Sequence, residues 1–321
     1  MADFNISQNT KKAAFVALAG RPSVGKSTLV NLLCGAKVAI VSAVPQTTRN
    51  AVRGILTRPE GQLVFVDTPG RHVSEKKLNK KLMDVADRAL DDSELVLYVL
   101  DAARSPGPEE EAVAARLREF QGRMVAAINK TDVPAAETKR LLEFLAQSLP
   151  DLPPSRCFEI SCRKNEGTGP LLDCLFGMAV EGDPLYPEEY YTDQEMSFRI
   201  SEIIREKAMN RLREELPHSI YVEVADLEFR DVPGGNPNGD SDSIPGAGKK
   251  RLWVRAFIIT ERESQKGMIV GKGGEMIKAI GQAARKELNA IFDWKVELDL
   301  RVKTGKDWRH NDRILKKITG N

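Results

Sequence analysis

The pattern Gly-x-x-x-x-Gly-Lys-Ser stands at residues 20–27, where the sequence reads GRPSVGKS. Glycines at both ends of such a loop allow backbone N–H groups to point inward and surround phosphate oxygens. Lys26 brings a positive charge for the terminal phosphates, and Ser27 brings a hydroxyl that can bind Mg²⁺. An apolar run at 13–20 precedes the pattern, and a helical run at 25–34 follows it. A strand, a glycine loop and a helix N-terminus in this order predict a site for the phosphates of a nucleotide.

A second candidate group is the carboxylate of Asp67, which ends the apolar run in VFVDTPG at 64–70. Burying a carboxylate at the end of a strand is costly unless a cation or hydrogen-bond donors accompany it. Beside a phosphate loop, this carboxylate is expected to hold a water molecule of Mg²⁺. The N–H group of Gly70 is expected to donate to the terminal phosphate. Asp67 follows Lys26 by 41 positions (67 − 26), which leaves room for one intervening strand.

The segment VPQTTR at 44–49 lies between these two motifs and has no strong periodicity. We predict that Thr48, in preference to Thr47, completes the Mg²⁺ shell and closes on the terminal phosphate. The predicted Mg²⁺ ligands are Ser27, Thr48 and, through water, Asp67. The residues predicted to carry hydrolysis are Lys26, Thr48, Asp67 and Gly70.

The identity of the base is indicated by AAINKTD at 126–132. Guanine presents N1–H and an exocyclic NH₂ group side by side, and the carboxylate of Asp132 can accept from both. Adenine lacks this donor pair, so the same carboxylate would face an unmatched edge. The stem of Lys130 can lie along the ring, and the backbone around Ser161 and Cys162 in the later segment ISCR can meet the guanine O6. The predicted ligand is GTP, and the predicted product is GDP.

These motifs together define one predicted guanine-nucleotide site. Its predicted nucleotide contacts are Gly20, Arg21, Pro22, Ser23, Val24, Gly25, Lys26, Ser27, Thr28, Asp67, Thr68, Pro69, Gly70, Asn129, Lys130, Asp132, Ser161 and Cys162.

A different motif, Gly271-Lys272-Gly273-Gly274, lies between two helical runs in MIVGKGGEMIKAIG at 268–281. A GxxG turn of this kind exposes backbone N–H groups and clamps about four nucleotides of single-stranded nucleic acid. The part of the chain from Lys249 to Asn321 carries 18 Lys and Arg and 9 Asp and Glu, a net charge of +9, whereas the rest carries −7. A plain helix–helix turn and a solvated basic face are the alternatives, but the combination predicts RNA binding.

The predicted RNA contacts are Ile269, Gly271, Lys272, Gly273, Gly274 and Lys278. For Ile269 and Ile277, packing beneath the bases and packing in the core remain alternatives. The segment DWRHNDR at 307–313 can add arginine and aromatic contacts, or it can begin an amphipathic terminal helix.

The elements that must position these motifs alternate between short apolar runs and helical runs up to about residue 180, which predicts a mostly parallel sheet covered on both faces. The predicted strands are 13–20, 62–67, 94–101, 123–129 and 156–161, and the predicted helices are 25–34, 77–92, one starting near 108, 134–149 and 169–180. Beyond a proline-rich linker at 181–193, we predict a helix over 194–216, strands at 219–229, 251–260 and 295–303, and two helices around the GxxG turn.

We therefore predict two domains of different class. Their predicted bounds are a tail at 1–12, an α/β domain at 13–180, a linker at 181–193, and a smaller α+β domain at 194–321 with a mobile insertion at 230–250. The chain has a net charge of +2, and no apolar run approaches the roughly 18 residues that cross a bilayer. No signal peptide is expected, and four cysteines without a C-x-x-C pair predict reduced thiols and no metal cluster.

With PQTTR between the first two motifs, YPEEYYTD in the linker and GKGG downstream, the chain resembles the Era-like family of GTPases with a C-terminal type II KH domain. The resemblance extends from about Ala13 to about Arg309. It implies a Ras-like, Mg²⁺-dependent GTPase with a slow intrinsic rate. It also implies binding near the 3′ end of small-subunit (16S) ribosomal RNA, and a role in assembling the small ribosomal subunit. A cytoplasmic monomer with peripheral association at the inner face of the cell membrane is also implied.

Three positions depart from the family pattern. Ser23 stands where Asn is usual, and because that Asn helps to hold an activating K⁺ in related GTPases, hydrolysis is predicted to depend little on K⁺. Arg71 follows DTPG where an apolar residue is usual, so a glutamine that orients the attacking water is absent there. Cys162 replaces a small alanine.

Two other functions are possible on the residues alone. A GTPase that acts in tRNA or other RNA modification shares the TTR feature but needs a further catalytic group. An RNA-binding protein with a degenerate nucleotide site would not need the complete set Lys26, Ser27, Asp67 and Asp132.

Overall fold

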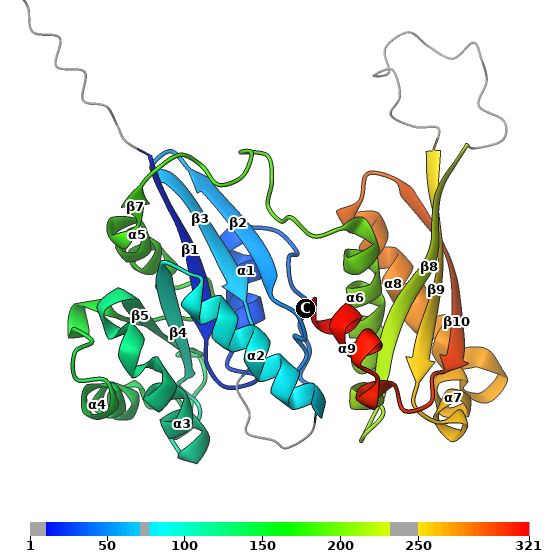
Figure 1. The fold of residues 1–321 in the computed structure, drawn as a ribbon, viewed down its shortest axis with the longest axis horizontal. Coiled ribbons are helices and arrows are strands. Elements are labelled where there is room, and N and C mark those ends of the chain that lie inside the picture. Colours follow the sequence, from blue (N-terminus) through cyan, green and yellow to red (C-terminus); the bar gives the residue numbers. More distant parts are fainter. Residues whose placement is uncertain (1–10, 71–76, 232–249, 321) are drawn as a thin grey trace, which may run out of the picture. The chain divides into compact units, whose positions relative to one another are not determined.

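The computed structural model describes residues 11–70, 77–231 and 250–320, which form two compact units (Figure 1). The first unit contains the chain up to Val41, Pro45–Asp193 and the end from Leu315. The second unit contains Ser42–Val44 and Gln194–Ile314. Most of the predicted tail at 1–12 and of the predicted insertion at 230–250 lies outside the described residues.

The first unit is built on a seven-stranded sheet in the order β2-β3-β1-β4-β5-β6, with β7 paired to β1. The pairs of β1, β3, β4, β5 and β6 are parallel, whereas β2 runs antiparallel to β3 and β7 antiparallel to β1. The strands are β1 Lys12–Ala19, β2 Val52–Arg58, β3 Gly61–Asp67, β4 Leu95–Asp101, β5 Met124–Asn129, β6 Cys157–Glu159 and β7 Val180–Glu181. Continuous apolar runs form the central strands because both faces of the sheet are covered, and every residue of β4 is buried.

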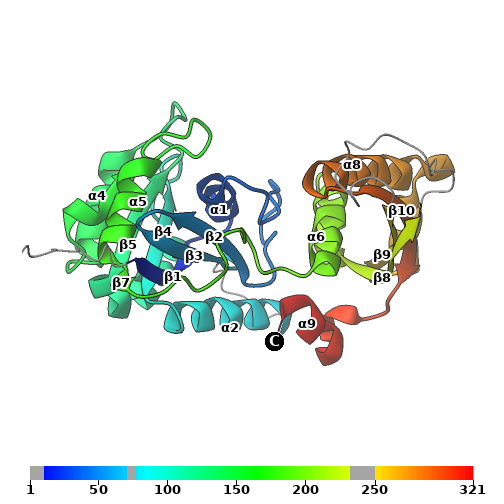
Figure 2. The same ribbon diagram turned by 90° about the horizontal axis from the view of Figure 1, so that it is seen from above.

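Five α-helices lie wholly within the described part of this unit: α1 Lys26–Cys34, α2 Lys77–Asp91, α3 Pro108–Leu117, α4 Thr138–Ser148 and α5 Thr168–Met178. Leu90 of α2, Val113 of α3 and Leu145 of α4 share one buried cluster with alternate residues of β1, β4 and β5. Helix α1 lies on the other side of the sheet from α2 (Figure 2). This arrangement confirms the prediction of an α/β domain with a mostly parallel sheet.

The sequence did not locate β2 or β7. Two predicted helices are shorter in the structure: α4 begins at Thr138 and not at 134, and one helix of the second unit ends early. Helix α6 spans Met196–Met209 and ends well before the predicted Leu216. The chain turns after Asn210, and Glu214 has a φ of 55°, a left-handed conformation that an α-helix cannot contain.

The predicted linker follows the edge strand β2 within the first unit. Ile55 N donates to Tyr191 O at 2.9 Å, and Arg53 Nη1 lies 2.8 Å from Asp193 Oδ2. The backbone of Tyr186 is held at both its N–H and C=O groups by the side chain of Gln62. Backbone pairing of this kind covers the exposed edge of the sheet, which otherwise presents unpaired polar groups.

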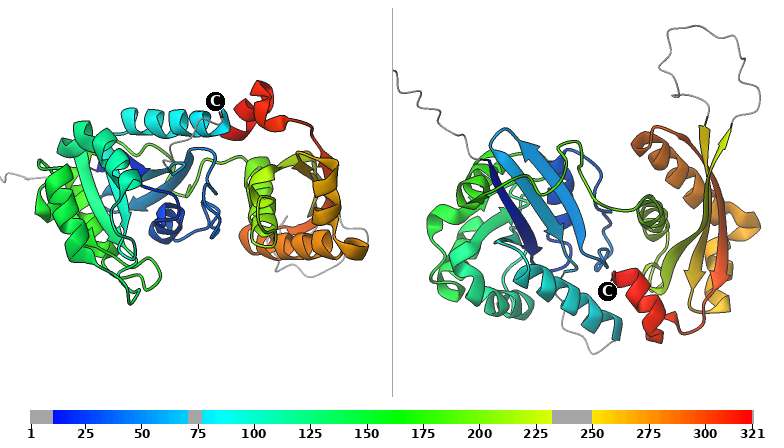
Figure 3. Two further views of the ribbon diagram at one scale, coloured as in Figure 1. Left: turned by 90° about the horizontal axis from the view of Figure 1, so that it is seen from below. Right: turned by 45° about the horizontal axis from the view of Figure 1, so that its top comes forward.

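The second unit contains a three-stranded sheet in the order β10-β9-β8. The strands are β8 Ile220–Asp231, β9 Lys250–Thr260 and β10 Lys295–Thr304. Strand β8 is antiparallel to β9, and β10 is parallel to β9. Its helices are α6, α7 Glu263–Val270, α8 Glu275–Ile291 and α9 Asp312–Thr319, of which α9 ends in the first unit. Helices α6 and α8 pack together and share a buried cluster with alternate strand residues such as Val254 and Val296 (Figure 3). The order helix, strand, strand, helix, GxxG, helix, strand confirms the predicted type II KH arrangement.

Candidate nucleotide-binding site and nucleic-acid interface

The carboxyl ends of parallel strands gather the predicted nucleotide residues at one edge of the sheet. The phosphate loop follows β1, Asp67 ends β3, and Asn129 ends β5. Gly25 stands at the start of α1 with a φ of 107°, and a Cβ atom there would lie 2.3 Å from Asn129 Nδ2. A side chain at this position would therefore separate the phosphate loop, residues 20–27, from the loop at 129–132 that is predicted to recognise the base, called the base-recognition loop below.

Lys26 is almost completely buried beneath the loop that it follows. Its Nζ donates to the carbonyl oxygens of Gly20 at 3.0 Å and Arg21 at 3.1 Å. Burial lowers the pKa of Lys26 to about 8, against the opposing negative charges of Asp67 and Glu110. The ammonium is thus held by two weak acceptors in a place where bound phosphates would be far stronger partners.

The lowered pKa of Lys26 predicts how nucleotide affinity depends on pH. Below pH 8 the side chain is already charged, whereas above pH 8 binding must take up a proton. We expect the affinity for GDP to fall by up to about tenfold per unit of pH between 8 and 9. Calorimetric titrations from pH 7 to 9 measure this change. Lys26→Arg is the control, because its side chain stays charged and any remaining pH dependence comes from deprotonation of the guanine ring. A wild-type affinity that follows the control across this range contradicts the prediction.

Ser27, Thr48 and Asp67, the three predicted Mg²⁺ ligands, come together in the structure. Ser27 Oγ donates to Asp67 Oδ2 at 2.6 Å, and Thr48 Oγ1 donates to the same oxygen at 3.3 Å. The two hydroxyl oxygens lie 3.1 Å apart. Asp67 is fully buried, and burial raises its pKa while the charge of Lys26 and the two hydroxyl groups oppose the rise.

The other oxygen of this carboxylate, Asp67 Oδ1, is buried without a hydrogen-bond partner among the described residues. An unpaired buried carboxylate oxygen is costly, so this oxygen is suited to a donor or a cation. Two hydroxyls and a carboxylate are hard oxygen ligands of the type that Mg²⁺ takes. The residues therefore fit a Mg²⁺ ion.

The segment after β3 lies directly against the phosphate loop. A Cβ atom on Gly70 would lie 2.6 Å from Pro22 N, so only glycine allows the two backbones to approach this closely. Thr68 Oγ1 donates to Leu18 O at 2.7 Å and fixes the segment to β1. The next residue, Arg71, lies outside the described residues.

The base-recognition loop is connected to the phosphate loop by side chains. Asn129 Nδ2 donates to Val24 O at 2.9 Å, and Asn129 Oδ1 accepts from Cys162 N at 3.1 Å. Asp132 Oδ1 accepts from Ser161 Oγ at 2.7 Å, and this hydrogen bond lowers the pKa of Asp132. The carboxylate predicted to read guanine is therefore oriented and ionised at neutral pH.

Two acidic residues in this region were not predicted from the sequence. Glu110 of α3 is fully buried, pairs with Arg21 of the phosphate loop at 2.5 Å, and accepts from Tyr98 Oη at 2.6 Å. Asp101 ends β4 and lies 2.6 Å from Lys130 Nζ. Asp101 ends an apolar run as Asp67 does, and this signal was available in the sequence.

In the second unit, the residues Gly271-Lys272-Gly273-Gly274 form the turn between α7 and α8. Gly273 and Gly274 have φ values of 60° and 81°, and the space beside each is open. Lys272, Gly273 and Lys278 are exposed. The turn thus presents accessible backbone and positive charge next to the N-terminus of the 17-residue helix α8.

Two apolar candidates for RNA contact belong instead to the hydrophobic core. Ile269 is 0% exposed and packs in the core of the second unit, which corrects its prediction as an RNA contact. Trp308 is also fully buried, donates from Nε1 to Ser219 O at 3.1 Å and contacts Tyr221 edge-to-face. A terminal helix, one of the two alternatives for the segment 307–313, follows as α9.

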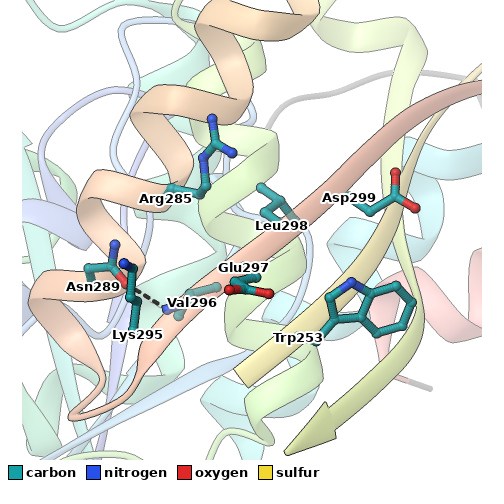
Figure 4. Close-up of a pocket in the computed structure, with 8 residues that line it drawn as sticks. All are labelled: Trp253, Arg285, Asn289, Lys295, Val296, Glu297, Leu298 and Asp299. Atoms are coloured by element: carbon teal, nitrogen blue, oxygen red, sulfur yellow. Dashed lines mark hydrogen bonds between the residues drawn. The ribbon is translucent and has the colours of Figure 1, made fainter. Parts of the chain in front are cut away.

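A pocket of about 490 Å³ lies farther along α8, against the edge strand β10 (Figure 4). Arg285 and Asn289 of α8 and Trp253 of β9 face it, and Asn289 Oδ1 accepts from Val296 N at 2.7 Å. Lys295, Glu297 and Asp299 of β10 complete a lining of mixed charge. This lining favours neither an anionic nor a cationic ligand.

In the described part of the chain, every helix is too short or too polar to cross a membrane. Glu261, Asp307 and His310 have potential metal ligand atoms within 4.8 Å of one another. Glu261 is paired with Arg309 at 3.1 Å, so we do not assign a metal site to these three residues.

Two known protein families match separate parts of the chain. A family described as 50S ribosome-binding GTPase matches residues 15–130, and the KH domain family matches residues 241–309. The GTPase Era of Treponema denticola is 47% identical over 304 residues, which cover 95% of this chain and 98% of that protein. The GTPase Era of Borreliella afzelii is 41% identical over 307 residues, which cover 96% and 99%.

Two solved structures are similar to almost the whole length of the chain. A crystal structure of Era in complex with MgGDPNP and nucleotides 1506–1542 of 16S ribosomal RNA has a TM-score of 0.85 and 32% identity, covering 97% of this chain and 99% of that one. A variant of Aquifex aeolicus Era bound to GDP·AlF₄⁻ has a TM-score of 0.83 and 32% identity, covering 96% and 99%.

Proposed function

The chain belongs to the Era family of GTPases, and from this premise we propose that it is a GTP-controlled switch that binds small-subunit ribosomal RNA near its 3′ end. Its proposed task is to assist assembly of the small ribosomal subunit. The convergence of Ser27, Thr48 and Asp67 carries the GTPase part of the proposal. The RNA part is supported by the exposed GxxG turn and by the RNA in the similar Era structure.

Hydrolysis depends on positioning and on neutralising the charge that develops on the phosphates. We propose that backbone N–H groups of the phosphate loop and the N-terminus of α1 hold the β-phosphate. Lys26 exchanges the carbonyl oxygens of Gly20 and Arg21 for phosphate oxygens. The N–H group of Gly70 donates to the γ-phosphate, and Asp132 accepts from the guanine edge.

Mg²⁺ is the proposed cofactor, since the similar Era structure contains it with a GTP analogue. Ser27 and Thr48 would hold the ion directly and Asp67 through water. The ion would neutralise charge on the β- and γ-phosphates. We propose that Thr48 is ordered by these contacts and released on hydrolysis.

The domain bounds, a cytoplasmic location, a monomeric state and peripheral contact with the inner face of the cell membrane also belong to this proposal. The resemblance to Era supports the location, the monomeric state and the membrane contact, and the division into units at Asp193 and Gln194 supports the domain bounds. A role in RNA modification is the second candidate, but no side-chain group in the described residues favours it.

Measuring GTP turnover with and without small ribosomal subunits tests the proposed function. We expect slow turnover that requires Mg²⁺ and is altered by subunits carrying the 16S 3′ end. Subunits lacking this RNA segment serve as the matched control. Turnover that needs no Mg²⁺ would overturn the nucleotide assignment, and equal behaviour with both kinds of subunit would overturn the RNA assignment.

A further inference from the structure

Asp101 is the last residue of β4 and lies outside the motifs that predict the nucleotide site. It is only 1% exposed. Strands β4 and β5 are parallel neighbours in which Asp101 stands opposite Asn129, so its carboxylate lies beside the start of the base-recognition loop. Because a buried carboxylate is costly unless it is paired, its partners indicate what it does.

The two oxygens of this carboxylate have different partners. Asp101 Oδ2 accepts from Lys130 Nζ at 2.6 Å, and Oδ1 accepts from the backbone N–H of Ala103 at 3.0 Å. The exposed guanidinium of Arg104 lies farther away, at 3.5 Å from Oδ2. The shortest contact is therefore the one to Lys130, whose side chain is also less exposed than that of Arg104.

Lys130 is held at both ends of its side chain. Its backbone has a φ of 68°, a left-handed conformation that is costly for a residue other than glycine. Its Nζ also donates to the carbonyl oxygen of Ser23 in the phosphate loop at 2.8 Å. The ammonium thus connects the end of β4 to the phosphate loop, and the methylene stem between these anchors is the part expected to lie along the guanine ring.

We propose that Asp101 is a positioning residue for guanine-nucleotide binding. Its carboxylate holds the Lys130 ammonium against Ser23, so the stem lies in place before the base arrives and little conformational entropy is lost on binding. The inference rests on the proposed guanine-nucleotide site. A purely structural carboxylate that only caps the turn at Ala103 is the competing explanation.

Asp101→Asn separates the two explanations. The amide keeps an oxygen for Ala103 but removes the charge that holds Lys130. We expect the affinities for GDP and GTP to fall by a similar factor of about 10, with faster nucleotide dissociation. The preference for guanine over xanthine should stay unchanged, because Asp132 is untouched.

The decisive measurement is a double-mutant cycle with Lys130→Met, which keeps the stem and removes the ammonium. If Asp101 acts through Lys130, then Asp101→Asn should cost nothing further in the Lys130→Met background, or should improve binding by removing an unpaired charge. An equal loss in both backgrounds overturns the proposal. So does a Lys130→Met protein that binds GDP as tightly as wild type, and this second test stands even if Asp101→Asn fails to fold.

Arg104→Ala is the matched control, since it removes the exposed cation and leaves the Lys130 contact in place. Its affinity for GDP should stay within about twofold of wild type, a difference that corresponds to about 0.4 kcal/mol. A wild-type protein without affinity for guanine nucleotides would overturn the proposed function itself. That result is distinguishable from a wild type that binds and an Asp101→Asn variant that binds equally well.

Discussion

Asp132→Asn is expected to weaken GTP binding on the order of a hundredfold and to turn the preference of the protein toward xanthine nucleotides. The carboxylate can accept from both guanine N1–H and the exocyclic NH₂ group. An amide NH₂ would face that NH₂ group as a second donor, whereas xanthine offers an oxygen at the same position. Ser161 Oγ already holds Asp132 Oδ1 at 2.7 Å, so the group is oriented without a nucleotide.

Competition between GDP and xanthosine diphosphate for a fluorescent guanine nucleotide measures this exchange. Asp92→Asn provides a matched control, since Asp92 is an exposed carboxylate just after α2, away from the predicted nucleotide contacts. The control should keep wild-type affinity and preference. An Asp132→Asn protein that still prefers guanine would remove Asp132 from base recognition.

The elements found from the sequence were those with a strong local pattern. Strand β4 is a continuous apolar run with polar or charged flanks, and such runs predict buried strands. Strand β2 reads VRGILTR, in which the apolar residues neither alternate nor form a run. Its position comes from seven paired positions along β3, and such long-range pairing is invisible to a local pattern.

The same distinction applies to the site. Lys26, Asp67 and Asp132 were predicted because each belongs to a motif whose spacing reflects a ligand. Glu110 and Asp101 belong to no such spacing, because their partners Arg21 and Lys130 lie in loops from other parts of the chain. The roles of Ile269 and Trp308 also became clear only from the positions of their side chains. The sequence does not show whether an apolar residue near an RNA-binding turn packs in the core or contacts the RNA.

The second large effect is expected for a protein that carries both Lys272→Asp and Gly273→Asp. It should bind RNA with the 16S 3′ end on the order of a hundredfold more weakly, because negative charge would face the phosphates and side chains would block the backbone approach. Gly273 has a φ of 60°, which Asp tolerates better than most residues, and the space beside it is open. The variant is therefore expected to fold.

Two titrations at several salt concentrations, one with this RNA and one with GTP, separate RNA binding from nucleotide binding. The salt dependence of RNA affinity should become shallower by about one unit of slope for each lost phosphate contact. Affinity for GTP should stay within about twofold of wild type. Lys139→Asp with Gly122→Asp makes the same change of charge at exposed positions of the first unit, where the space beside Gly122 is open.

The control distinguishes a specific contact from the general effect of charge. If the basic character of residues 249–321 attracts RNA only through the net field of the protein, both double variants lose affinity by a similar factor. If the GxxG turn clamps the RNA backbone, the loss is confined to the variant in that turn. If the Lys272→Asp and Gly273→Asp protein binds the RNA as tightly as wild type at near-physiological salt, the turn does not bind RNA. The basic segment is then only a charged face exposed to solvent. The GTPase site would remain, because its residues Ser27, Thr48 and Asp67 lie in the other unit.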